Sequence, residues 1–114
     1  MLYAGTEFGM YVSFDDGANW QSLQLNLPVT PISDLQVYRR DLVVSTFGRG
    51  LWVLDDLSVL EQMDPHTATD RHRLFAPRDG VRPAANGSYP PVDGGATISY
   101  YLAEDVHPVT LEIR

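Results

Sequence analysis

The sequence predicts an all-β fold that contains blades of a β-propeller. Most of its segments alternate between apolar and polar residues at period two and are rich in β-branched and aromatic side chains, as strands are. The first half also contains an internal repeat of about 40 residues. Several short strands within a repeat of that length are typical of propeller blades.

The repeat joins two short segments in each unit. Residues 2–6 match 42–46 at an offset of 40, and residues 9–12 match 50–53 at an offset of 41. Both units therefore share a strand that ends in Thr, a short turn that contains Gly, and a second strand that begins Gly–apolar–aromatic–Val. Helical repeats can have similar periods, but alternation at period two favours strands.

The alternation places six strands in the first half, at 2–6, 9–14, 20–24, 33–38, 41–47 and 50–54. Pro28 and Pro31 predict a loop between the third and fourth strands, because proline cannot donate to a strand ladder. Arg40 and Asp41 lie between two apolar strands and favour a tight hairpin turn.

A short helical turn, a linker and a second hairpin follow. Ser58 and Glu61 have the spacing of a capping box, which predicts one turn of helix. Between 77 and 95, eight of 19 positions are Pro or Gly, so we expect an irregular linker, placed at 64–95. Residues 96–102 and 109–113 alternate again and predict a hairpin within 96–114, with its turn over 103–108.

One short motif, SFDDGANW at residues 13–20, is specific. Gly17 supplies the positive φ that a tight turn needs. We expect Asp15 to accept hydrogen bonds from backbone N–H groups, Ser13 to close the turn, and Trp20 to cover it and bury a large apolar area. The segment resembles the Asp box, or BNR repeat, of the form Ser-x-Asp-x-Gly-x-Thr-Trp, with Asn19 where Thr is typical.

The carboxylates of this motif have two interpretations. They could serve catalysis or Ca²⁺ binding, or they could hold a folded turn. The resemblance implies that the defining residues build a structural hairpin on the outer part of a blade, away from the central binding face. We assign the motif this structural role and assign no catalytic, cofactor-binding or metal-binding residue; His66 and His72 fit no standard metal-ligand spacing.

The wider stretch over 1–63 resembles BNR-repeat, sialidase-like glycosyl hydrolases and the related sortilin-type propellers. Within it, residues 45–56 look like the closing segment of the last blade in large bacterial members. Residues 96–113 are similar to the first hairpin of FlgD-like Ig-like domains, which often follow large extracellular propellers. The resemblance implies a last-blade region over 1–63, a linker over 64–95, and the start of an Ig-like module, a partial β-sandwich, over 96–114.

The catalytic residues of sialidases cannot be assigned here. Sialidases use an arginine triad, a Tyr/Glu nucleophile pair and an acidic acid/base residue. Only Arg49 lies in a loop where it would reach a ligand face, because Arg39 and Arg40 fall in a predicted hairpin. We therefore expect a non-catalytic structural or interaction fragment of a larger protein. The alternatives are a sialidase-like glycoside hydrolase whose catalytic residues lie upstream, and a sortilin-like propeller that binds a peptide.

The composition narrows the classes of site and partner. The chain of 114 residues has no cysteine, which excludes disulfides, iron–sulfur clusters and thiolate zinc sites. Its net charge of −7 argues against non-specific nucleic-acid binding. No apolar run approaches the roughly 20 residues of a membrane-spanning helix. The chain begins and ends in predicted strands, so we expect its partners to be upstream blades of an extracellular or periplasmic parent, with a glycan or peptide as ligand.

Overall fold

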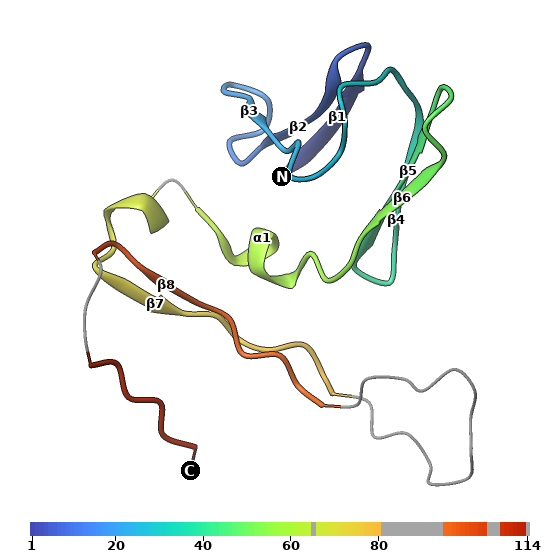
Figure 1. Cartoon of the computed structure of the whole chain (residues 1–114). Helices are drawn as coiled ribbons and strands as arrows, with labels where there is room; N and C mark the ends of the chain where they lie inside the picture. Colours follow the sequence, from blue (N-terminus) through green and yellow to red (C-terminus); the bar gives the residue numbers. More distant parts are fainter. Residues whose placement is uncertain (65, 81–94, 105–107, 114) are drawn as a thin grey trace, which may run out of the picture. The chain divides into compact units, whose positions relative to one another are not determined.

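A computed structural model describes residues 1–64, 66–80, 95–104 and 108–113 (Figure 1). The chain divides into two units, Met1–Pro65 and His66–Arg114, which we describe separately. The first unit contains two antiparallel three-stranded sheets and a short helix, and the second contains a two-stranded hairpin. The predicted all-β class is confirmed.

The first sheet is an antiparallel meander in the order β1-β2-β3. Its strands are β1 (Leu2–Thr6), β2 (Gly9–Ser13) and β3 (Gln21–Ser22). β1 and β2 lie within one residue of their predicted bounds, whereas β3 is shorter than the predicted 20–24. The chain nevertheless stays beside β2 after β3 ends, because the Leu23 N–H donates to the Met10 carbonyl at 2.9 Å.

The second sheet has the same topology, in the order β4-β5-β6. Its strands are β4 (Ile32–Tyr38), β5 (Asp41–Thr46) and β6 (Leu51–Leu54), each within one residue of its predicted bounds. The turn between β4 and β5 consists of Arg39 and Arg40, which have φ of 51° and 65°. Two consecutive positive φ values match the twist of a two-residue hairpin.

The core of the first unit lies between the two sheets. Its buried residues are Met10, Leu42, Val44 and Leu57. β1 approaches β4 closely at Gly5, where an added Cβ would lie 2.5 Å from Ile32 Cγ2 and 3.3 Å from Leu35 Cδ2. Glycine is therefore required at this position for the sheets to pack.

Helix α1 (Ser58–Gln62) begins differently from the prediction. The predicted capping box is wrong, because Leu57 occupies the N-cap position without a side-chain cap. The Ser58 N–H instead donates to Asp56 Oδ1 at 3.1 Å. Leu57 is buried in the core and its N–H donates to the Arg40 carbonyl at 2.7 Å, so packing rather than a capping box fixes where the helix starts.

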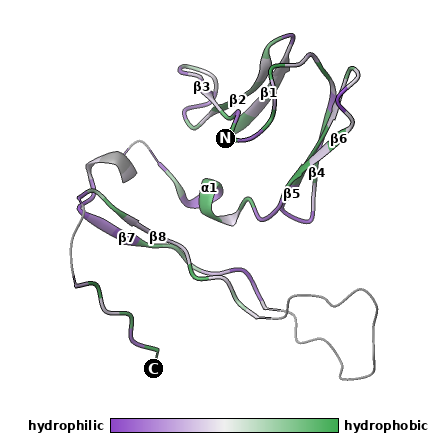
Figure 2. Ribbon diagram, viewed as in Figure 1, coloured by the Kyte–Doolittle hydropathy of each residue, from purple (hydrophilic) through white to green (hydrophobic). Residues whose placement is uncertain are grey.

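The second unit is built on one hairpin. Its elements are the 3₁₀ turn η1 (Thr67–Thr69), β7 (His72–Leu74) and β8 (Tyr100–Leu102). The two strands are antiparallel, and two further backbone bonds, Phe75 N–H to Ser99 and Ala103 N–H to Arg71, extend the ladder at both ends. Figure 2 shows that β7 is largely hydrophilic.

This pairing corrects the predicted hairpin between 96–102 and 109–113. β8 pairs with β7, which comes from the segment predicted to be linker, and residues 108–113 form no strand. Burial alternates over 72–75, where Arg73 is half-buried and Phe75 is buried between exposed neighbours, as the pleat of a strand requires. The residue types there, His-Arg-Leu-Phe, do not alternate, so they did not indicate a strand. Pro108 has no N–H for a ladder. Residues 81–94 of the predicted linker and 105–107 of the predicted turn lie outside the described residues.

Candidate functional site

The candidate site is the turn formed by residues 13–20, which connects β2 to β3. Ser13 is the last residue of β2 and is fully buried. Beyond Phe14 and Asp15 the chain reverses, with positive φ at Asp16 (56°) and at Gly17 (95°). The positive φ predicted for Gly17 is present, and glycine adopts it without a Cβ penalty.

Side-chain hydrogen bonds close the turn. Ser13 Oγ donates to Asp15 Oδ1 at 2.9 Å and accepts from the Gly17 N–H at 2.8 Å. Asp15 Oδ1 also accepts from the Asn19 N–H at 2.8 Å, and Asp15 Oδ2 accepts from the Asn19 side-chain amide at 2.6 Å. Both carboxylate oxygens are thus engaged by donors inside the turn. Asn19, at the position where Thr was typical, supplies two of these contacts.

These donors hold Asp15 in its charged form. The hydrogen bond from the Asn19 side chain, then that from the Asn19 N–H and that from the Ser13 hydroxyl, lower the pKa of Asp15 below its usual value. A general acid requires the opposite shift, a raised pKa that keeps the proton available near neutral pH. The geometry therefore gives Asp15 the chemistry of a fixed hydrogen-bond acceptor.

Trp20 only partly behaves as predicted. Its ring does lie by the turn, because a Cβ added at Gly17 would be 3.9 Å from Trp20 Cζ2. The residue nevertheless remains 44% exposed, so it buries less apolar area than we expected. The strand that follows it, β3, is only two residues long, and both of its residues are exposed.

Arg49, the predicted ligand-face residue, is exposed in the turn between β5 and β6. Its N–H donates to Thr46 Oγ1 at 3.1 Å, and its carbonyl accepts from Trp52 Nε1 at 2.9 Å. Arg39 and Arg40 lie at the opposite end of β5, where Arg40 Nε is 3.5 Å from Glu61 Oε2. The structure therefore does not bring these three arginines together.

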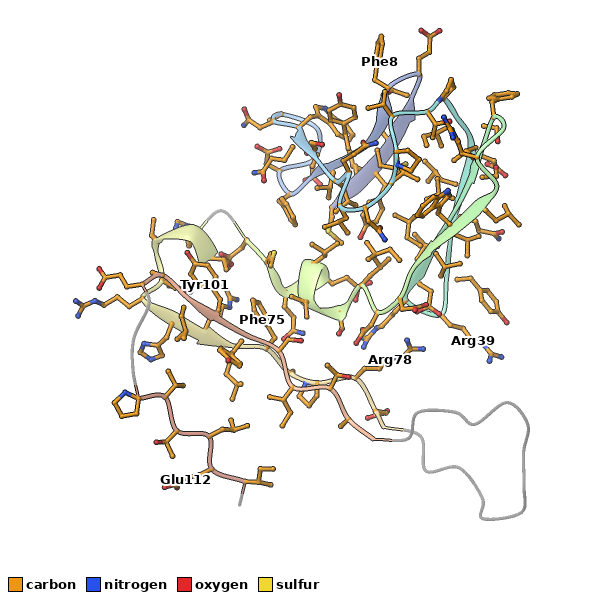
Figure 3. The ribbon with its side chains drawn as sticks, viewed as in Figure 1. Phe8, Arg39, Phe75, Arg78, Tyr101 and Glu112 are labelled. Atoms are coloured by element: carbon orange, nitrogen blue, oxygen red, sulfur yellow. The ribbon has the colours of Figure 1, made fainter. Side chains whose placement is uncertain are left out.

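Two threonines form matching turns, a role the sequence did not reveal. Thr6 Oγ1 donates to the Gly9 carbonyl at 3.0 Å and accepts from the Phe8 N–H at 3.1 Å. Thr46 Oγ1 donates to the Gly50 carbonyl at 2.7 Å and accepts from the Arg49 N–H. The signal was the Thr that ends the first strand of both repeats. Figure 3 shows Phe8 projecting from the first of these turns.

Gln24 is a second residue that sequence reasoning missed. Its Oε1 accepts from the Met10 N–H at 3.3 Å, and its Nε2 donates to the carbonyls of Leu27 and Pro28 at 2.9 and 3.1 Å. Gln24 thereby ties the loop before β4 to β2. The only signal in the sequence was a polar residue within a run of leucines.

Over the described ranges, no three His, Asp or Glu side chains gather in a way that could hold a metal ion. No helix in that part of the chain is both long enough and apolar enough to cross a membrane. Comparisons of the chain with models of known protein families, with curated proteins and with solved structures find no match.

Proposed function

We propose that the chain is a non-catalytic structural or interaction part of a larger BNR-repeat propeller protein, extracellular or periplasmic, and that residues 1–63 supply its last-blade region. The observation that carries the proposal is the repetition of one turn in two packed sheets. Thr6 and Thr46 end the matching strands β1 and β5, and each closes its hairpin with the same two kinds of hydrogen bond.

The strand order supports a blade as the repeating unit. The repeat aligns β1 with β5 and β2 with β6. β3 pairs on the far side of β2, and β4 pairs on the far side of β5. Superposing the two sheets therefore gives a sheet with four antiparallel strand positions. The outer positions are those of β4 and β3. Between them, β5 and β1 share the position next to β4, and β6 and β2 share the position next to β3. Propeller blades are four-stranded antiparallel sheets.

The turn at 13–20 supports a structural role within that blade. Its polar groups satisfy one another through the bonds between Ser13, Asp15 and Asn19. In the proposed parent, an upstream strand would cover the edge of β1 that has no partner among the described residues. The β7–β8 hairpin would belong to the module that follows the propeller.

Catalysis provides the test. The full chain should release no fluorophore from a panel of aryl glycosides that includes a sialoside, and Arg49→Ala should behave like the wild-type chain. Asp15→Ala should lower the melting temperature and leave any glycan or peptide binding unchanged. Turnover by the wild-type chain that Arg49→Ala abolishes would refute the proposal and favour the glycoside hydrolase.

A further inference from the structure

The outer edge of β6 carries no partner strand among the described residues. β5 covers one edge of β6, and β6 is the last strand of its sheet. Its counterpart β2 is covered on both edges, because β3 pairs with it through Tyr11↔Ser22 and Val12↔Gln21. After β6 the chain enters α1 instead of returning as a strand. An open edge of this kind is a template for another strand.

The register shows which residues of β6 face outward. The Thr46 N–H donates to the Gly50 carbonyl, and the paired residues continue through Val44↔Trp52 and Leu42↔Leu54. Because hydrogen-bonded pairs alternate in an antiparallel ladder, Leu51 and Val53 direct their N–H and C=O groups away from β5. Their side chains are 74% and 55% exposed.

We propose that this edge is an interface with a second copy of the chain, in which β6 pairs with β6 antiparallel about a two-fold axis. A ladder forms only where outward-directed residues oppose one another. In each copy the outward-directed residues are Leu51 and Val53. The register in which both take part sets Leu51 opposite Val53 of the second copy, with Trp52 at the axis. The product is a continuous six-stranded sheet, and the same surface serves both copies.

The charges next to β6 fit a second copy. The same register sets Arg49 opposite Asp55 of the second copy, and the two-fold axis repeats that pair. Both residues are exposed, and across the described ranges neither side chain forms an ion pair or hydrogen bond. Two Arg–Asp pairs therefore flank the two Leu–Val contacts. They oppose the general repulsion between two chains of net charge −7. The inference does not depend on the sheets being propeller blades.

The test is sedimentation velocity of the full chain over a range of concentrations. We expect a reversible monomer–dimer equilibrium, measured at one fixed ionic strength because salt screens both the flanking pairs and the repulsion between the chains. Val53→Pro should abolish the dimer while far-UV circular dichroism stays unchanged, because it removes only an N–H that faces away from β5.

Charge reversal gives a second route if Val53→Pro fails to fold. Arg49→Asp should weaken the dimer by roughly tenfold, and Arg49→Asp/Asp55→Arg should restore it. Arg39→Asp, an arginine at the other end of β5, is the matched control and should leave the dimer intact. A monomer at every concentration overturns the proposal, as does a dimer that neither Val53→Pro nor Arg49→Asp weakens.

Discussion

Replacing Ser13 by alanine should destabilise the first unit although the residue touches no ligand. Ser13 is fully buried, and its hydroxyl donates to Asp15 at 2.9 Å and accepts from the Gly17 N–H at 2.8 Å. Ser13→Ala leaves that N–H without its acceptor and removes one donor from the carboxylate. Leaving a partly buried polar group unsatisfied costs about 1–3 kcal/mol.

That loss is large for a unit of this size. The first unit spans Met1–Pro65, and in so small a unit 1 kcal/mol shifts the melting temperature by about 4–8 °C. We therefore expect Ser13→Ala to melt about 4–24 °C lower than the wild-type chain. Thermal unfolding followed by tryptophan fluorescence is the assay, because Trp20 lies beside the turn.

Ser33→Ala is the matched control for this prediction. Ser33 Oγ lies 2.7 Å from Ser45 Oγ, but the pair is exposed, so its loss should change stability by about 0.5 kcal/mol or less. Equal melting temperatures for Ser13→Ala and the wild-type chain would refute the structural role of the turn, and so would an equal loss in Ser33→Ala.

Three further results are expected. The lowered pKa of Asp15 contributes stability that is present above its unfolded pKa of 3.8 and is lost as pH falls through the lower folded pKa. Chemical denaturation at several pH values should therefore show that the difference in unfolding free energy between wild type and Asp15→Asn shrinks below pH 3.8. Gly5→Ala should lower the free energy of unfolding by about 1–3 kcal/mol, because its Cβ would overlap Ile32. Arg39→Asn should raise it by roughly 0.5–1 kcal/mol, because asparagine tolerates the positive φ of 51° better; urea titration measures both.

The sequence predicted the first unit well because its information is local. Alternation at period two placed the strands from β1 to β6, and the repeat linked the two hairpins that end in Thr6 and Thr46. The fixed spacing of polar residues at 13–20 predicted the turn in the same way, because each of its hydrogen bonds joins residues no more than four apart.

The remaining features depend on contacts between distant segments. β7 and β8 are separated by 25 residues rich in Pro and Gly, so composition pointed to a linker and hid the strand at His72–Leu74. The start of α1 depends on the burial of Leu57 and its bond to Arg40, which no capping pattern encodes.

The two sheets related by the repeat pack against each other through β1 and β4. The chain has no cysteine, so two introduced cysteines report the contact between their own two positions and no native thiol competes with them. A Cβ at Gly5 would lie 2.8 Å from Ile32 Cβ. The two Cβ atoms of a disulfide lie about 3.5–4.5 Å apart, so the strands need to separate only slightly to form one.

Oxidation of Gly5→Cys/Ile32→Cys at low concentration therefore tests that packing directly. As a control we choose Gly5→Cys/Val53→Cys, because Val53 lies two strands away from β4 within the second sheet. We expect rapid and complete formation of an intramolecular disulfide in the first variant, detected by mass and by gel mobility, and little in the control. No disulfide in native buffer, or equal rates in the two variants, would show that β1 and β4 do not pack against each other.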